Sequence, residues 1–119
     1  MGTDIRRIQT NARMSKAVIC GGMVFLSGQT SSGMAADSLD QQMQEVLGRI
    51  DKLLAEAGSD KSHLLTATIY LKSVADFAAM NVIWEGWIPS GAAPARTTVE
   101  ARLASPDLLV EITVAARLP

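Results

Sequence analysis

The sequence is poor in the residues that build disulfides and most metal centres. Among its 119 residues there is one cysteine, Cys20, and one histidine, His63. A single cysteine excludes an intramolecular disulfide, and a single histidine excludes a His-rich metal cluster and disfavours a Ser-His-Asp triad. We expect Cys20 to be a small buried hydrophobic residue and His63 to be a solvated loop residue. The sequence therefore predicts no metal site.

Charge of one sign and long apolar runs are also missing. The net charge is -1, and no block of like charges occurs. This pattern disfavours a nucleic-acid-binding surface and a basic helix at a membrane. No apolar segment approaches the length of a membrane span, and the first eight residues lack the apolar run of a signal peptide. We therefore expect a cytoplasmic protein without nucleic-acid or membrane partners.

What the sequence has is the composition of one globular domain spanning residues 1–119, with 48% hydrophobic and 19% charged residues. Apolar periodicity predicts a long helix over 38–57 and a second that starts near 73–76 and ends before Pro89. Alternation and turn signals predict strands at 5–8, 17–20, 23–27, 65–72, 97–103 and 108–116. The order of elements predicts an α/β (α+β) fold with two helices on one face of a sheet.

Local signals set several boundaries. Ser38 and Gln41 form a predicted capping box, and Gly58 ends the long helix. Gly21 and Gly22 predict a tight hairpin between the second and third strands, and residues 104–107 predict a turn joining the last two. Two helices cannot cover both faces of the sheet, so we expect a homo-oligomer. A monomer with a half-polar open face is the alternative.

Arg96, directly before one predicted strand, and Glu111, within another, are charged residues that each need an explanation. The planar guanidinium of Arg96 is suited to a carboxylate, although pairing with Glu100 is the structural alternative. Glu111 interrupts an apolar strand, so it either orients a water as a general base or forms a cross-strand salt bridge. If the last two strands pair across their turn, the two residues still need not face each other. Each can instead meet groups of another subunit.

Weaker candidates lie on two other elements. Asn81 falls in the apolar stripe of the second helix, where an amide bonded to backbone is the alternative to substrate contact. Residues 27–29, S-G-Q, end a strand at which free backbone N–H groups can face a ligand. Each of these signals is weak on its own.

Four segments carry a resemblance to a known family. They are V-F-L-S-G-Q (24–29), D-F-A-A-M-N (76–81), P-A-R-T-T-V-E (94–100) and L-V-E-I (109–112). Their order and spacing resemble those of the RidA/YjgF family, the reactive intermediate deaminases, over essentially the whole chain. The resemblance implies a chorismate-mutase-like fold with a six-stranded mixed sheet. It also implies a homotrimer with a ligand cleft at each subunit interface and no cofactor.

The resemblance also implies roles for residues of this sequence. Arg96 corresponds to the arginine that binds the substrate carboxylate, and Glu111 to the glutamate that holds the attacking water. Ser27 and Gly28 correspond to residues that line the cleft, with the Gly28 N–H as a carboxylate donor.

Three further positions follow from the same comparison. Thr98 stands where deaminating members commonly have a cysteine that contributes backbone contacts, and Asn81 corresponds to the helix asparagine. Met14 stands where the family usually has a tyrosine that helps to close the cleft, and the loop after Gln29 is short. These departures put the identity of the substrate in question.

The activity that the resemblance implies is hydrolysis of amino-acid-derived enamines or imines, of the 2-aminoacrylate or 2-iminobutanoate type, to 2-oxo acids and ammonia. The alternative is a non-catalytic protein that binds a small carboxylate metabolite in the same cleft. A weaker alternative is an endoribonuclease or translation inhibitor, which the net charge and the single histidine disfavour.

Overall fold

The computed structural model describes residues 4–32 and 37–119. The strands are β1 (Arg6–Thr10), β2 (Ser15–Cys20), β3 (Met23–Leu26), β4 (Leu64–Leu71), β5 (Ala95–Glu100) and β6 (Val110–Arg117). The helices are α1 (Leu39–Ala57) and α2 (Phe77–Trp87), with short 3-10 turns at Lys61–His63 and Val74–Asp76. The predicted six strands and two helices are confirmed. The short loop predicted after Gln29 runs into residues 33–36, which lie outside the described residues.

The strands form one mixed sheet in the order β1-β2-β3-β6-β4-β5. Only β4 and β5 among these neighbours are parallel, because α2 carries the chain from one to the other as a crossover. The last two strands do not pair across their turn, which the sequence had left open: β4 lies between β5 and β6. Both edges of β4 are therefore paired, while β5 is an edge strand.

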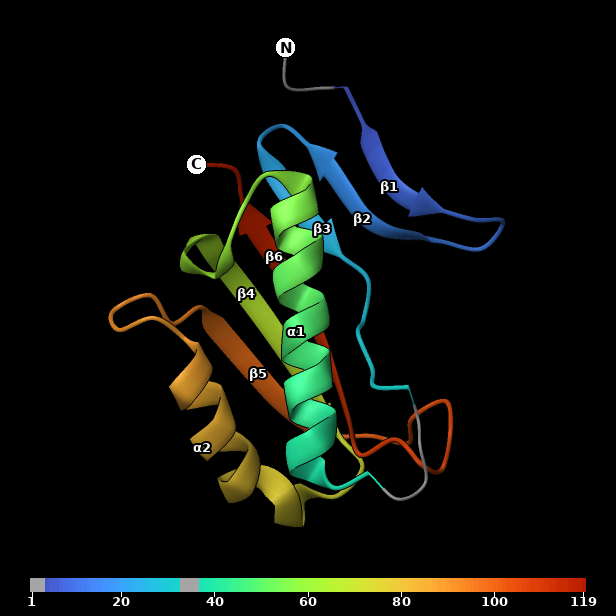
Figure 1. Cartoon of the computed structure of the whole chain (residues 1–119), viewed down its shortest axis with the longest axis vertical. Coiled ribbons are helices and arrows are strands. Elements are labelled where there is room, and N and C mark those ends of the chain that lie inside the picture. The colour runs from blue at the N-terminus through green and yellow to red at the C-terminus, as the bar shows by residue number, and fades with distance from the viewer. Residues whose placement is uncertain (1–3, 33–36) are drawn as a thin grey trace.

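Both helices lie on the same face of the sheet (Figure 1). α1 packs on β2, β3 and β6, and α2 packs against α1 near the β5 edge. Alternating strand residues such as Ile69, Ile112 and Val24 are fully buried beneath the helices. The opposite face, called the open face below, carries Phe25 with 47% of its surface exposed.

The ends of α1 follow the sequence signals. Ser38 accepts a hydrogen bond from the backbone N–H of Gln41, and the Gln41 side chain accepts one from the Ser38 N–H. Gly58 ends the helix in the left-handed conformation, with φ 91°. The capping box and the glycine terminus are both confirmed.

A buried amide fixes the approach to β6. Gln42 is fully buried in the first turns of α1. Its Nε2 donates to the Asp107 carbonyl and its Oε1 accepts from the Leu109 N–H, each at 2.8 Å. Because both ends of the amide are satisfied, this side chain ties the helix to the segment that leads into β6.

The hairpin between β2 and β3 turns at Gly21 (φ 60°) and Gly22 (φ 77°), as predicted. Cys20 lies beside this turn opposite Met23 and is half-buried, so the expectation of a buried cysteine is wrong. Its neighbours Ile19 and Ala17 at alternate positions face the helices, which places Cys20 on a part of the sheet that no helix covers.

In the described part of the chain, no helix is long and apolar enough to cross a membrane. Across the same residues, no three His, Cys, Asp or Glu side chains gather as metal ligands.

Two glycines, one within α1 and one at its C-terminal end, give opposite expectations. Gly48 lies inside α1 with open space where a Cβ would be, so Gly48→Ala is expected to raise the free energy of unfolding by about 1 kcal/mol. Gly58 has φ 91°, so Gly58→Ala is expected to lower it by about 1 kcal/mol. Urea unfolding followed by circular dichroism measures both. Equal effects of the same sign would contradict this account of α1.

Candidate functional site

Arg96 lies on β5 among aromatic side chains of α2. Its Cζ is 5.8 Å from the ring centroids of both Phe77 and Trp84, and its Nη1 is 4.0 Å from the Met80 sulfur. The alternative partner Glu100 instead accepts a hydrogen bond from the Val74 N–H at 2.9 Å. Among the described residues no carboxylate pairs with Arg96. The guanidinium is thus held by π faces while its hydrogen-bonding fork remains available.

Two other predicted residues flank this arginine. Thr98 is two positions further along β5 on the same face, and its Oγ1 is buried without a hydrogen-bond partner in the described chain. Asn81 is four residues after Phe77 and three before Trp84 on α2, which places it beside the aromatic contacts of Arg96. We call Arg96, Thr98 and Asn81 the arginine group.

The aromatic contacts of Arg96 are the part of the site that the sequence did not reveal. Phe77, Met80 and Trp84 read as a stripe of core residues at helical spacing. A signal that could have found them is the parallel β4–α2–β5 crossover, which lays the inward face of α2 along the strand that follows it.

Glu111 lies on β6 opposite Tyr70 of β4, on the open face. The chain after β3 runs beside it, because Gln29 pairs with Ile112 while Phe25 pairs with Ala115. The chain advances four residues from Phe25 to Gln29, whereas β6 advances only three between Ile112 and Ala115. The chain after β3 therefore contains a bulge.

Gly28 sits in this bulge and approaches Glu111 closely. A Cβ at Gly28 would collide with Glu111 Oε2, lie 3.0 Å from its Cδ and lie 3.2 Å from Thr113 Oγ1. A side chain of any size would therefore displace the carboxylate. The close approach explains why glycine is needed here.

The backbone around Gly28 leaves one amide available. The Ser27 N–H donates to the Lys16 carbonyl and the Gln29 N–H to the Ile112 carbonyl, each at 2.9 Å. The Gly28 N–H between them has no acceptor within residues 4–32 and 37–119. The buried Gln29 side chain donates to the Ser27 carbonyl and hydroxyl and so fixes this segment. We call Ser27, Gly28 and Glu111 the glutamate group.

Met14 lies at the same end of the sheet as the glutamate group. It closes the β1–β2 turn, where the Asn11 side chain accepts from its N–H and its carbonyl accepts from the Asn11 N–H. Two residues later, Lys16 is bonded to Ser27. The Met14 side chain is 37% exposed.

The two groups lie on opposite faces of the sheet. Arg96 is aligned across β4 with Ala67 and then Val114, both buried under the helices. Glu111 is three residues from Val114 and therefore points the other way. The predicted site residues thus form two clusters in one chain, and the structure does not bring Arg96 to Glu111. The cross-strand salt bridge considered for Glu111 is also absent from the described residues.

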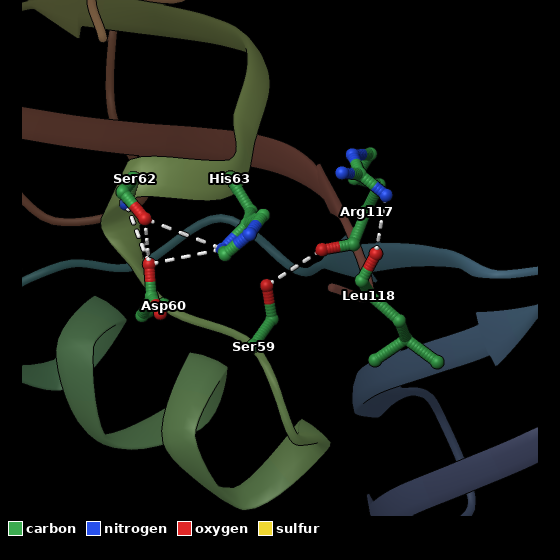
Figure 2. A network of polar contacts seen from close by, with 6 residues as sticks. All are labelled: Ser59, Asp60, Ser62, His63, Arg117 and Leu118. Atoms are coloured by element: carbon green, nitrogen blue, oxygen red, sulfur yellow. Dashed lines mark hydrogen bonds and ion pairs between the residues drawn. The ribbon is translucent and has the colours of Figure 1, made fainter.

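His63 belongs to a third polar cluster that resembles a triad in residue types alone (Figure 2). Its Nδ1 lies 3.1 Å from Asp60 Oδ1 and 3.3 Å from Ser62 Oγ. Serine and aspartate in a triad contact opposite ring nitrogens, whereas here both contact the same one. The cluster caps the 3-10 turn, so His63 is a structural residue with 24% of its side chain exposed and not a solvated one.

The fold and the two residue groups define a small α+β protein of the kind seen in solved YjgF-family structures. A crystal structure of NMB1025, a YjgF-family member from Neisseria meningitidis, superposes with a TM-score of 0.92 at 45% identity, covering 100% of this chain and 98% of that one. A family model described as endoribonuclease L-PSP matches residues 4–118. The chain belongs to this family, the RidA/YjgF family, as the sequence motifs predicted.

Relatives of similar length match almost the whole chain. A RutC family protein of Haemophilus ducreyi is 41% identical over 114 residues, covering 96% of this chain and 97% of the relative. The RutC family protein YoaB of Escherichia coli is 41% identical over 112 residues, covering 94% of this chain and 96% of YoaB. The similarity therefore includes both residue groups.

The third cluster gives a prediction for acid stability. Hydrogen bonds from the Ser62 hydroxyl and then its backbone N–H lower the pKa of Asp60 below its ordinary value. A depressed folded pKa stabilises the fold above the unfolded pKa of about 3.9, and this stabilisation is lost as the pH falls. The stability difference between the protein and Asp60→Asn is therefore expected to be constant near neutrality and to shrink below pH ~4. Urea unfolding of both proteins, near neutral pH and again below pH ~4, checks this. A stability difference that does not depend on pH would contradict it.

Proposed function

We propose that this protein is a deaminase that hydrolyses imine and enamine derivatives of amino acids to 2-oxo acids and ammonia. The observation that carries the proposal is Arg96, a half-buried cation with no carboxylate partner in the described chain. A guanidinium fixed by two rings is preorganised for a bidentate carboxylate. Family membership supports the same role.

The separation of the two groups supports a cleft made by two copies of the chain. Arg96 lies on an edge strand on the helix side, and Glu111 lies on the open face. A substrate that needs both must bind where the β5 edge of one copy meets the open face of another. The open face has Phe25 47% exposed, and Val99 on β5 is 41% exposed, which suits burial between subunits. With the family resemblance, we propose a homotrimer with one such cleft at each interface.

The proposed reaction depends more on orienting the substrate and the water than on activating the substrate. Arg96 binds the substrate carboxylate, and the Gly28 N–H donates a second hydrogen bond to it. Glu111 accepts a proton from a water whose oxygen adds to the C=N carbon. The proton then passes from Glu111 to the nitrogen of the carbinolamine. The C–N bond breaks as the hydroxyl oxygen forms the C=O bond and gives its own proton to Glu111, so that ammonia and a 2-oxo acid are released. Glu111 then loses this proton to the ammonia or to solvent. The iminium carbon is already electrophilic, so the proposal calls for no cofactor.

The same cleft could serve a non-catalytic sensor of small carboxylates, and the role of Glu111 separates the two functions. A sensor requires Arg96 and has no use for a general base. The name of the family model, endoribonuclease L-PSP, also makes RNA cleavage a required control. The only histidine, His63, contacts Asp60 and Ser62 through Nδ1 and belongs to neither the arginine group nor the glutamate group.

Substitution of either charged residue tests the deaminase proposal. Arg96→Ala removes a charge-assisted bidentate bond and is expected to lower kcat/KM for 2-iminobutanoate by about a hundredfold or more. Glu111→Gln is expected to lower kcat by about 10²–10⁴-fold while carboxylate binding persists. The imine is generated in situ by a threonine dehydratase, and its loss is compared with spontaneous hydrolysis. Unchanged turnover in Arg96→Ala refutes the proposal, and absence of turnover in the unmodified protein favours the sensor.

Mixing the two variants tests where the cleft lies. In a mixed assembly, an Arg96→Ala subunit can supply Glu111 and a Glu111→Gln subunit can supply Arg96. About one quarter of the interfaces formed by random mixing then contain both groups. Refolding the inactive variants together is expected to restore a corresponding fraction of activity. No recovery from a demonstrably mixed assembly contradicts a cleft shared between copies.

The close approach of Gly28 to Glu111 provides an independent prediction. Gly28→Ala places a methyl group where the carboxylate lies, so it is expected to reduce kcat by about 10²-fold with little loss of stability, because the half-buried Glu111 side chain can move aside. Gly48→Ala is the matched control, since its added methyl group meets open space. Full activity in Gly28→Ala shows that the position of Glu111 is not required.

A further inference from the structure

Each of the two groups has an exposed apolar side chain beside it. Phe77 is 42% exposed although its ring contacts the Arg96 guanidinium. Met14 is 37% exposed at the end of the sheet that carries Ser27 and Gly28. Exposed large apolar residues adjoining a carboxylate site are a surface on which the rest of a ligand can lie.

The position of Phe77 links this surface to the substrate side chain. The guanidinium carbon lies 5.8 Å from both the Phe77 and the Trp84 rings, but Trp84 is buried. A molecule whose carboxylate binds Arg96 therefore meets the free part of Phe77 first. The substituent on the adjacent carbon is the part that reaches this ring.

Met14 supplies an adaptable apolar surface beside the glutamate group. Its thioether has three rotatable bonds and no hydrogen-bond donor, so it fits side chains of different shapes and offers nothing to a charged one. The alternation that continues from β2 places it on the open face, as Glu111 is. Lys16, a cation, lies two residues further along the chain on the same face.

We infer that the cleft selects imines of amino acids with larger apolar side chains, such as leucine, over those with a one-carbon or cationic side chain. This inference rests on the proposed deaminase function. A short side chain leaves Phe77 and Met14 without contact. A cationic one would be desolvated near Arg96 and Lys16, while the carboxylate of Glu111 is engaged with the attacking water.

The expected selectivity follows from buried area. Removing one methylene from water changes an equilibrium constant about fourfold. Phe77 and Met14 stay partly exposed, so the gain per methylene is smaller here. The leucine imine, with three more carbons than the alanine imine, is therefore expected to have a kcat/KM about tenfold higher or more. The arginine imine is expected to fall below both.

The experiment supplies each imine with an L-amino-acid oxidase acting on leucine, alanine, arginine or glutamate and measures 2-oxo acid formation against the uncatalysed rate. Met14→Gln is expected to lower the leucine-to-alanine ratio of kcat/KM by about threefold or more, whereas Met14→Leu keeps it. Phe77→Ala is expected to lower the same ratio. Val82→Gln is a matched control, because Val82 is 71% exposed on α2 away from Arg96 and its change is expected to leave the ratio unaltered.

The outcomes separate the two proposals. If no imine is hydrolysed faster than in buffer, the deaminase function fails. If all four are accelerated within about threefold of one another, or if Met14→Gln and Phe77→Ala leave the ratio unchanged, the function stands and the selectivity is refuted. A preference for the glutamate imine also refutes it and assigns the side-chain contact to Lys16.

Discussion

The alternation of side chains along the strands, combined with the insertion of β4 between β5 and β6, is the constraint from which the rest follows. It puts Arg96 beneath α2 and Glu111 on the uncovered face. No rotamer change within one chain can reverse this, since exchanging faces needs a one-residue slip of a whole strand. Two chemically complementary groups thus lie apart within one chain. If the proposed function holds, assembly and chemistry are the same requirement.

The glutamate group depends on contacts made far away in the sequence. Gln42 of α1 holds the Asp107 carbonyl and the Leu109 N–H, and so fixes the start of the strand that carries Glu111. On the other side, the Gln29 amide holds Ser27 and thereby the bulge at Gly28. Two buried amides therefore position the segments that carry Gly28 and Glu111. An amide such as that of Gln42, bonded to backbone at both ends, specifies geometry more sharply than apolar packing can.

Much of the fold could be predicted from local patterns. The period-2 and period-3.6 repeats indicated every strand and both helices, and the Ser38 cap and the Gly21–Gly22 turn are as expected. The strand order could not be obtained this way, because β4 separates β5 from β6 through pairings that no local turn signal encodes. For the same reason the site residues were identified by motif while their division between two faces, and the aromatic partners of Arg96, emerged from the structure. The exposure of Cys20 depended likewise on which face the helices cover.

The contacts of Arg96 with aromatic rings have a consequence for tryptophan fluorescence. Trp84 and Trp87 are the two tryptophans of the chain, and their ring centroids lie 5.4 Å apart. Trp84 contacts the guanidinium and Trp87 Nε1 donates to Asp51, so both indoles sit in fixed electrostatic surroundings. A carboxylate bound to Arg96, as proposed, would neutralise a cation held against one of them. Tryptophan fluorescence would then report whether the arginine is occupied.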